Sequence, residues 1–289
     1  MSCDRKLKIL EVFIMPELPE VQTVVDSLRP NIRDKRIKEV EVLEEVLIEK
    51  PGLEEFAEIL IGQEIEAVRR RGKYIIMELD NGYYLVTHLR MTGRFIYSAA
   101  EEELDDYDYI LFEFADGGEL RLGSKRKFTR VYLVDDLAEA GSLTDLGPEP
   151  LSDEFTLDKF RKLIAKRRGR MKPLLLNQKF IAGLGSIYVD ESLFISGIHP
   201  LRTADTLRGG EITELYEAIK TVLEEGIKHR GTTKWDYVDA SGQAGSYQDE
   251  LRVYDREGEE CYVCGTMIQR TKVGSRSAYF CPRCQLMEE

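Results

Sequence analysis

The chain has 289 residues, 43% of them hydrophobic and 33% charged, with a formal net charge of −12 at pH 7. This length accommodates two or three compact units and exceeds what a zinc module alone requires. No apolar run approaches the roughly 18 residues of a membrane span. The apolar patch before residue 15 is interrupted by Glu11 and is followed by no small-residue cleavage site, so neither membrane insertion nor secretion is expected.

The acidic balance argues against a nucleic-acid partner, because a polyanion is normally met by a positive surface. The distribution of charge weakens that exclusion. Acidic residues concentrate between Glu101 and Asp108, whereas residues 161–172 contain basic side chains and no carboxylate. Smaller basic clusters lie at residues 69–73 and 125–127. A solvated face would explain any one cluster, but together they are compatible with an acidic protein that has a basic groove.

The first half of the chain predicts a short helix and then β-structure. Apolar residues at helical spacing indicate a helix from Glu20 to Leu28, which we expect Pro30 to end. From Ile37 to Val134 the pattern is alternation with turn signals such as Asn81-Gly82, which predicts a β-sandwich or flattened barrel. One further helix is expected near Leu53 to Leu60.

The character of the chain changes at residues 146–153, where two prolines and a glycine indicate a linker. Beyond the linker the apolar spacing becomes helical. Helices broken by glycines, among them Gly209-Gly210, are predicted over residues 157–164, 172–176, 187–195 and 212–227.

Two Cys-x-x-Cys pairs indicate a metal site, formed by Cys261, Cys264, Cys281 and Cys284. Each pair fits a tight turn, and Zn²⁺ would stabilise a unit of roughly 25 residues that cannot build its own core. Four thiolates leave no open position for water, so the expected zinc is structural and not catalytic. Disulfides are the less favoured alternative, and Cys3 is left over.

The residues between the cysteine pairs predict a β-hairpin over residues 271–280, with Lys272 and Arg276 near its tip. Such a hairpin is suited to grip phosphates. Taken alone, it would serve equally well as a protein-binding ribbon.

The segment Met15-Pro-Glu-Leu-Pro-Glu-Val resembles the N-terminus of the formamidopyrimidine-DNA glycosylases, in which the initiator methionine is removed and proline begins the mature chain. Leu18 stands where the related endonuclease VIII branch usually has glycine. Further motifs follow in the family's order and extend the resemblance over essentially the whole chain from Met15: Arg71-Gly-Lys-Tyr, His88-Leu-Arg-Met-Thr-Gly, Lys125-Arg-Lys-Phe, Leu146-Gly-Pro-Glu-Pro-Leu, Gly183-Leu-Gly-Ser-Ile-Tyr, Gly197-Ile-His-Pro, Gly231-Thr-Thr and the cysteine quartet.

The resemblance implies an α+β protein of several domains. We expect a catalytic β-sandwich flanked by helices over residues 15–145, a helix–two-turn–helix DNA-binding domain over 146–240, and a C-terminal region with a four-cysteine zinc finger over 241–289. Residues 1–14 are expected to be an N-terminal extension that precedes the true start at Met15; proteolytic removal of the extension, or its retention with loss of lyase activity, are the alternatives. A monomer in the cytoplasm, associated with the nucleoid in a bacterium, is expected from the same resemblance.

The resemblance further implies the catalytic residues Pro16, Glu17, Lys73 and Arg276. An N-terminal proline is a secondary amine with a pKa of about 8, and its attack on deoxyribose C1′ gives an iminium that permits strand elimination. Glu17 would move protons during base loss and ring opening. Lys73 would contact phosphate and assist elimination, and Arg276 would hold the phosphate of the damaged nucleotide. Pro16 must be the mature N-terminus, because an amide nitrogen has no usable lone pair.

Duplex DNA with oxidised bases or abasic sites is the implied partner. Met91, Arg126 and Phe128 would fill the space left by an extruded base, and the amides at the start of the helix after Gly183 would suit a phosphate. Ser186 stands where the family usually has asparagine, and Tyr107-Asp-Tyr109 replaces a histidine-rich stretch of some members. The full set of expected DNA-binding residues is His88, Met91, Tyr107, Arg126, Phe128, Arg168, Lys172, Gly185, Ser186 and Lys272.

The leading hypothesis is therefore a glycosylase and abasic-site lyase that acts on 8-oxoguanine and formamidopyrimidines. An oxidised-pyrimidine glycosylase of the same family is the close alternative, because residues 231–247, where the family's base-capping loop lies, are too irregular to interpret chemically. A non-catalytic DNA-binding relative and a zinc-ribbon protein-interaction factor are the competing classes.

Overall fold

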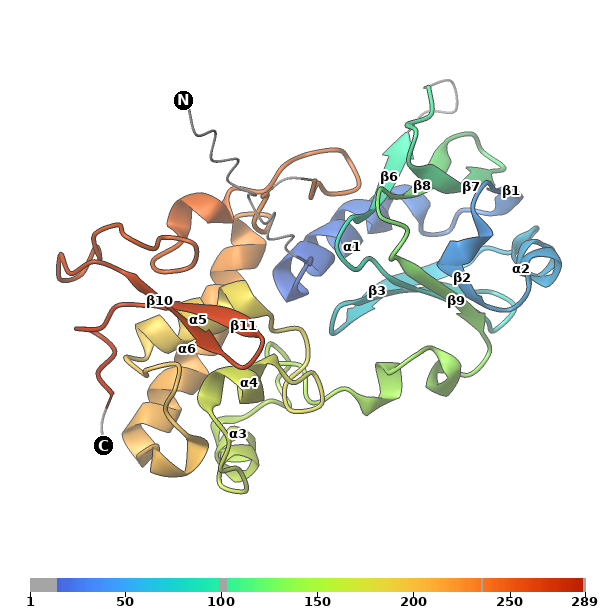
Figure 1. The fold of residues 1–289 in the computed structure, drawn as a ribbon. Helices are drawn as coiled ribbons and strands as arrows, with labels where there is room; N and C mark the ends of the chain where they lie inside the picture. The colour runs from blue at the N-terminus through green and yellow to red at the C-terminus, as the bar shows by residue number, and fades with distance from the viewer. Residues whose placement is uncertain (1–14, 99–102, 235, 288–289) are drawn as a thin grey trace, which may run out of the picture.

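A computed structural model describes residues 15–98, 103–234 and 236–287 (Figure 1). The expected extension, residues 1–14, and Cys3 lie outside the described residues. A β-rich body and a helical body lie side by side, and the last hairpin packs on the helical one (Figure 1). None of the helices described is long and apolar enough to cross a membrane.

The β-rich body is a sandwich of two sheets, as the alternating pattern predicts. Its strands are antiparallel, apart from the parallel pair β2 and β9. Phe95 and Phe112 of one sheet share a core with Ile75, Met77 and Leu85 of the other. The first sheet has the order β1 (Ile37–Val42), β7 (Asp108–Phe114), β8 (Glu119–Ser124), β6 (Gly93–Ser98), and the second β2 (Ile48–Lys50), β9 (Arg130–Val134), β5 (Tyr84–His88), β4 (Tyr74–Leu79), β3 (Ile65–Arg71).

The predicted Asn81-Gly82 turn connects β4 to β5. Gly82 has φ +83°, a left-handed conformation that favours glycine, and Asn81 Oδ1 accepts the N–H of Tyr83 at 3.1 Å. Glu78 therefore pairs with Tyr84 across the hairpin, and this register places His88 opposite Tyr74 at the inner end of the sheet.

Helix α1 (Leu18–Ile32) joins the two bodies. Val21, Val24 and Val25 pack in the sandwich core, whereas Leu18 packs in the core of the helical body. The expectation that Pro30 ends this helix is wrong, because the helix continues to Ile32. Proline removes one intrahelical N–H bond and crowds the carbonyl four residues earlier, and only two helical residues follow Pro30 before the helix ends.

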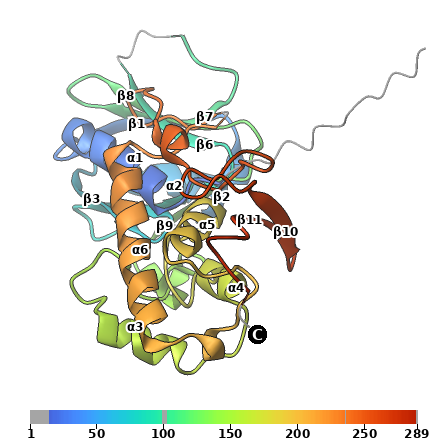
Figure 2. The ribbon, with the colours of Figure 1, turned by 90° about the vertical axis from the view of Figure 1, so that its left-hand side faces the viewer.

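The helical body contains α3 (Leu157–Ile164), α4 (Met171–Leu176), α5 (Ser186–Ile195) and α6 (Gly209–Lys228). Figure 2 shows the long helix α6 running past α1 and α3, with which it is in contact. Gly209 and Gly210, expected to break a helix, instead form the first turn of α6. The remaining short elements are α2 (Leu53–Leu60), as predicted, and the 3-10 turns η1 (Glu45–Leu47), η2 (Leu137–Glu139), η3 (Leu143–Asp145), η4 (Ala204–Thr206) and η5 (Tyr247–Glu250).

The C-terminal hairpin pairs β10 (Gln269–Val273) with β11 (Arg276–Phe280). The segment that leads to it is fixed on α5 by the buried Glu191. The Glu191 carboxylate accepts the backbone N–H groups of Arg252, Val253 and Tyr254, each at 2.9 Å. A buried carboxylate with three such donors is satisfied only in this arrangement.

We expect Glu191→Ala to lower the free energy of unfolding by about 3 kcal/mol, because three backbone N–H groups, two of them buried, lose their acceptor. Urea unfolding measures the change. Glu217→Ala removes an exposed carboxylate from α6 and should alter stability by no more than about 0.5 kcal/mol. Equal stability of the two variants would contradict this account of how the finger is attached.

Candidate active site

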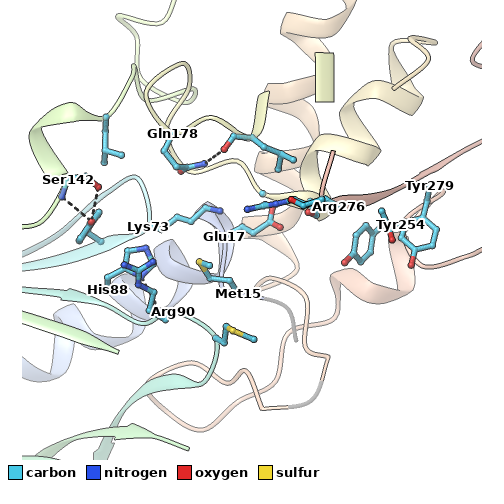
Figure 3. Close-up of a pocket in the computed structure, with 18 residues that line it drawn as sticks. Met15, Glu17, Lys73, His88, Arg90, Ser142, Gln178, Tyr254, Arg276 and Tyr279 are labelled. Atoms are coloured by element: carbon cyan, nitrogen blue, oxygen red, sulfur yellow. Dashed lines mark hydrogen bonds between the residues drawn. The ribbon is translucent and has the colours of Figure 1, made fainter. Parts of the chain in front are cut away.

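A cavity of about 610 Å³ lies where the sandwich, the helical body and the hairpin tip meet (Figure 3). Its lining comes from widely separated parts of the sequence. Three of the four expected catalytic residues line it, together with their surroundings. The lining residues are Met15, Glu17, Lys73, Tyr74, His88, Arg90, Met91, Ser142, Leu146, Leu176, Gln178, Gly185, Ser186, Tyr254, Ser275, Arg276, Ser277 and Tyr279. Pro16 is buried between Met15 and Glu17.

The Glu17 carboxylate binds the N-terminus of α5. It accepts the N–H groups of Ile187 at 3.1 Å and Tyr188 at 3.4 Å, where the helix dipole favours negative charge. A Cβ at Gly185 would lie 2.2 Å from this carboxyl group, so a side chain there would displace it. These two amides were expected to suit a phosphate; that expectation is wrong for them, because Glu17 already occupies both.

Burial raises the pKa of Glu17 from 4.5 to about 7. The charge of Lys73 opposes this rise, whereas the nearby Glu20 adds to it. Near neutral pH the carboxyl group is therefore divided between its protonated and ionised forms. Such a group can both donate and accept a proton during a reaction, as a general acid–base catalyst must.

Glu20 joins three elements beneath the cavity and was not among the expected site residues. Its buried carboxylate accepts the N–H of Glu17 at 2.9 Å, the hydroxyl of Tyr188 at 2.7 Å and the N–H of Thr232 at 2.7 Å. The spacing of three residues between Glu17 and Glu20 at a helix start indicates capping. No sequence signal indicates the link to Thr232, at the start of the irregular segment 231–247.

Lys73 and Arg276 converge on Glu17 from opposite sides of the cavity (Figure 3). Lys73 precedes β4 and is only 9% exposed, whereas Arg276 begins β11 and is exposed. Burial lowers the pKa of Lys73; the Glu17 carboxylate opposes that shift, and the charge of Arg276 adds to it. The structure thus brings Glu17, Lys73 and Arg276 together beside Pro16, as the resemblance implies.

Lys172 is not on the surface, which corrects the expectation that it contacts DNA. Its ammonium group is fully buried and lies 2.6 Å and 2.8 Å from the two oxygens of Asp190. It also donates to the carbonyl of Ser277, and Asp190 accepts the N–H of Tyr279 at 3.1 Å. The pair therefore fixes strand β11, and with it Arg276, onto α4 and α5.

Met91, Arg126 and Phe128 lie together although two different loops carry them. The Arg126 guanidinium stacks 4.9 Å from the Phe128 ring centre, and its Nη1 lies 3.8 Å from Met91 Sδ. Phe128 is 43% exposed and is not a core residue. An exposed aromatic side chain held by a guanidinium is compatible with a wedge between bases, which stays a prediction.

His88 is buried and electrically neutral. Burial, together with the charges of Arg90 and Lys73, lowers its pKa to about 3, and its Nδ1 accepts the N–H of Arg90 at 3.1 Å. Arg90 is itself exposed in the cavity, and sequence reasoning missed it although it lies inside the quoted His88 motif. Gln178, Tyr254 and Tyr279 also line the cavity without a signal in the sequence.

The remaining expected DNA contacts lie on exposed segments or at the cavity. Tyr107 is exposed beneath the ammonium of Lys125, 5.9 Å from its ring centre. Arg168 and Lys272 are exposed on the α3–α4 loop and on β10. Gly185 and Ser186 line the cavity at the start of α5, so the positions stay compatible with the expected contacts.

Cys261, Cys264, Cys281 and Cys284 place their sulfur atoms within 4.8 Å of one another. Neighbouring sulfurs are 3.5 to 3.9 Å apart, close to the roughly 3.8 Å edge of a tetrahedron with Zn–S bonds of about 2.3 Å. The donor set fits one structural Zn²⁺ and leaves no position for a water ligand. This confirms the metal site predicted from the cysteine spacing.

A β-sandwich, a helical domain and a zinc-finger hairpin enclosing one cavity define a DNA glycosylase of the helix–two-turn–helix type. Three family models match in order: the formamidopyrimidine-DNA glycosylase N-terminal domain over residues 15–131, its helix–two-turn–helix domain over 146–236, and the zinc finger found in such glycosylases and in isoleucyl-tRNA synthetases over 258–286. The chain belongs to the formamidopyrimidine-DNA glycosylase family.

Similar proteins cover nearly the same span. A formamidopyrimidine-DNA glycosylase of Pelotomaculum thermopropionicum is 46% identical over 94% of this chain and 99% of its own length. Two solved complexes match with a TM-score of 0.86 and 35% identity, over 94% of this chain and 100% of theirs. One is a Lactococcus lactis formamidopyrimidine-DNA glycosylase variant bound to DNA with a formamidopyrimidine lesion. The other is a related enzyme bound to DNA that contains carbocyclic 8-oxoguanine. The Lactococcus enzyme bound to oxidised-pyrimidine DNA matches with a TM-score of 0.86 and 36% identity over the same shares.

Removal of zinc should weaken DNA binding at least about tenfold, because the hairpin that carries Arg276 depends on the metal for its folded form. Fluorescence anisotropy with a duplex that holds a stable abasic-site analogue measures the affinity before and after chelation. Restored zinc should recover binding, whereas magnesium should not. Unchanged affinity of the zinc-free protein would show that the hairpin is not held by the metal.

Proposed function

We propose that this chain removes oxidised purines, namely 8-oxoguanine and formamidopyrimidines, from duplex DNA and then cleaves the abasic strand by β- and δ-elimination. The observation that carries the proposal is the convergence of Glu17, Lys73 and Arg276 on one cavity beside Pro16. The lesions follow from the DNA in the two matched solved complexes. We place the enzyme in the cytoplasm, with the nucleoid where the cell is bacterial, and infer that it acts as a monomer.

The chemistry begins at the Pro16 amine. Its lone pair attacks C1′ as the base departs with the bonding electrons and takes up a proton. The amine nitrogen then loses its proton, and the sugar ring opens to an iminium as its ring oxygen is protonated. The iminium accepts electrons when a proton leaves C2′, which expels the 3′ phosphate, and a second proton loss expels the 5′ phosphate. Glu17, whose pKa lies at about 7, moves the protons that ring opening and elimination require.

Lys73 and Arg276 interact with the phosphates of the damaged strand. Lys73 lies next to Glu17 inside the cavity, where a positive charge stabilises an expelled phosphate and assists elimination. Arg276 at the hairpin tip holds the phosphate of the damaged nucleotide. Both cations lie near Glu17, whose carboxyl group is partly protonated at neutral pH. A bound phosphate supplies the negative charge that Glu17 lacks when it is protonated.

Other residues act on the DNA around the lesion. Met91, Arg126 and Phe128 fill the stack after the damaged base is extruded. Tyr107, Arg168 and Lys272 contact the DNA backbone from exposed segments, and Gly185 with Ser186, at the start of α5, faces the lesion strand. The exposed basic side chains explain how a chain of net charge −12 binds a polyanion.

We further propose domain limits at 145/146 and 240/241, supported by family matches that fall within those limits. Oxidised pyrimidines are the second candidate lesion, favoured by the matched complex of the Lactococcus enzyme. Single-turnover excision of 8-oxoguanine compared with thymine glycol separates the two lesion classes.

Borohydride trapping on an 8-oxoguanine duplex tests the proline mechanism. Protein that begins at Met15, and loses that methionine, should crosslink to DNA at Pro16, because its amine is free; protein that retains residues 1–14 should not. Mass spectrometry of the crosslinked peptide identifies the attached residue. Intact strands and no crosslink with either form would refute the lyase mechanism, and a crosslink at another amine would refute the role of Pro16.

A further inference from the structure

The linker between the sandwich and the helical body grips the turn that carries Lys73. Glu149 of the linker accepts hydrogen bonds from Arg71 Nη1 at 2.8 Å and from the backbone N–H of Gly72 at 2.6 Å, both through Oε1. Its other oxygen lies 2.6 Å from Arg70 Nη2. One carboxylate of the linker thus contacts the last two residues of β3 and Gly72, the first residue of the β3–β4 turn.

The end of β3 and the turn also bind the linker backbone. Arg71 Nη2 donates to the carbonyls of Leu146 at 2.8 Å and Gly147 at 2.7 Å. Gly72 has φ +56°, and a Cβ on it would lie 2.8 Å from Leu146 Cδ1, so the backbone of the turn lies directly against the linker. These contacts close a reciprocal clamp between the turn and the linker.

The charged groups of the clamp, Glu149 and Arg70, are largely buried, so their mutual contacts fix its geometry. The Glu149 side chain is 19% exposed and that of Arg70 is 9% exposed. Although burial raises the pKa of Glu149, the Arg70 guanidinium and the bonds from Gly72 and Arg71 hold it below its usual value. The carboxylate is ionised under the conditions of the reaction, and removal of one partner leaves charge buried without compensation.

We propose that Glu149 is a positioning residue for strand elimination: by fixing Gly72 it holds the adjacent Lys73 in the cavity, beside Glu17. Lys73 is the next residue after the clamped amide, and its ammonium must stay among Glu17 and Arg276 in a largely buried site. A misplacement of about 1 Å in such a site is enough to slow a reaction about a hundredfold. The inference rests on the proposed role of Lys73.

The test measures strand cleavage on an abasic-site duplex under single-turnover conditions, with DNA affinity measured separately on the stable analogue. All variants are made in the form that begins at Met15. Glu149→Ala should slow cleavage about tenfold or more, while affinity changes less than about threefold. Glu149→Gln should recover the rate to within about threefold of the parent, because its carbonyl still accepts the N–H of Gly72.

The Lys73→Met background separates positioning from general damage. If Glu149 acts through Lys73, Glu149→Ala added to Lys73→Met slows cleavage no further. Equal slowing by Glu149→Ala in both backgrounds, or a parental rate for Glu149→Ala alone, would overturn the inference. A parental rate for Lys73→Met alone would instead refute the proposed role of Lys73.

The matched control is Asp145→Ala, which removes another carboxylate immediately before the linker. Asp145 pairs with Lys179 at 2.8 Å, but both side chains are more than half exposed, so the pair contributes little. Cleavage by this variant should equal that of the parent. If Asp145→Ala slowed cleavage as much as Glu149→Ala, any weakening of the linker region would slow the reaction, and the specific role of Glu149 would be refuted.

Discussion

The binding of the Glu17 carboxylate to the N-terminus of α5 is the interaction on which the site depends. It joins the first described residues of the chain to a helix that begins at Ser186, and it is supported by the amides of Ile187 and Tyr188. Only a glycine at position 185 leaves room for the carboxyl group. Since Glu17 directly follows Pro16, this contact also fixes where the proposed nucleophile lies.

The electrostatics of the cavity follow from this buried carboxyl group. Glu17, Glu20 and Lys73 are all buried and lie close together, and the charge of each changes the proton affinity of the others. Arg276 completes the charge set, but the finger carries it, and the finger is fixed by zinc and by the buried Lys172–Asp190 pair. The charged groups of the site therefore come together only when four segments are in place: the start of the chain with α1, the β3–β4 turn, the N-terminus of α5 and the C-terminal hairpin.

Local signals in the sequence predict much of the fold. The alternation from Ile37 to Val134, the Asn81-Gly82 turn and the spacing of the cysteines each depend on near neighbours, and the sandwich, the hairpin and the zinc site agree with them. The expectations that Pro30 ends a helix and that Gly209-Gly210 breaks one were wrong, because one proline or glycine near the end of a helix does not alone decide where the helix stops or starts.

The site is only partly predictable, because its main contacts are non-local. Glu17 and Ile187 are 170 positions apart, and Glu20 and Thr232 are 212 apart. Lys172 lies in a basic run that is typical of a solvated face, yet packing places it beside Asp190 inside the protein. A single sequence shows the type of each residue but not which distant partner buries it, so the resemblance supplied the catalytic set and the structure alone supplied Glu20 and Glu149.

The ionisation of Glu17 tests the central claim most directly. ¹³C NMR of glutamate-labelled protein, with the Glu17 signal assigned by its loss in Glu17→Gln, follows the carboxyl group through a pH titration. A midpoint at about pH 7, with the protonated form below it and the carboxylate above it, is the predicted result. A midpoint at the ordinary value of 4.5 would show that Glu17 is not buried against α5, and the account of the site would be wrong.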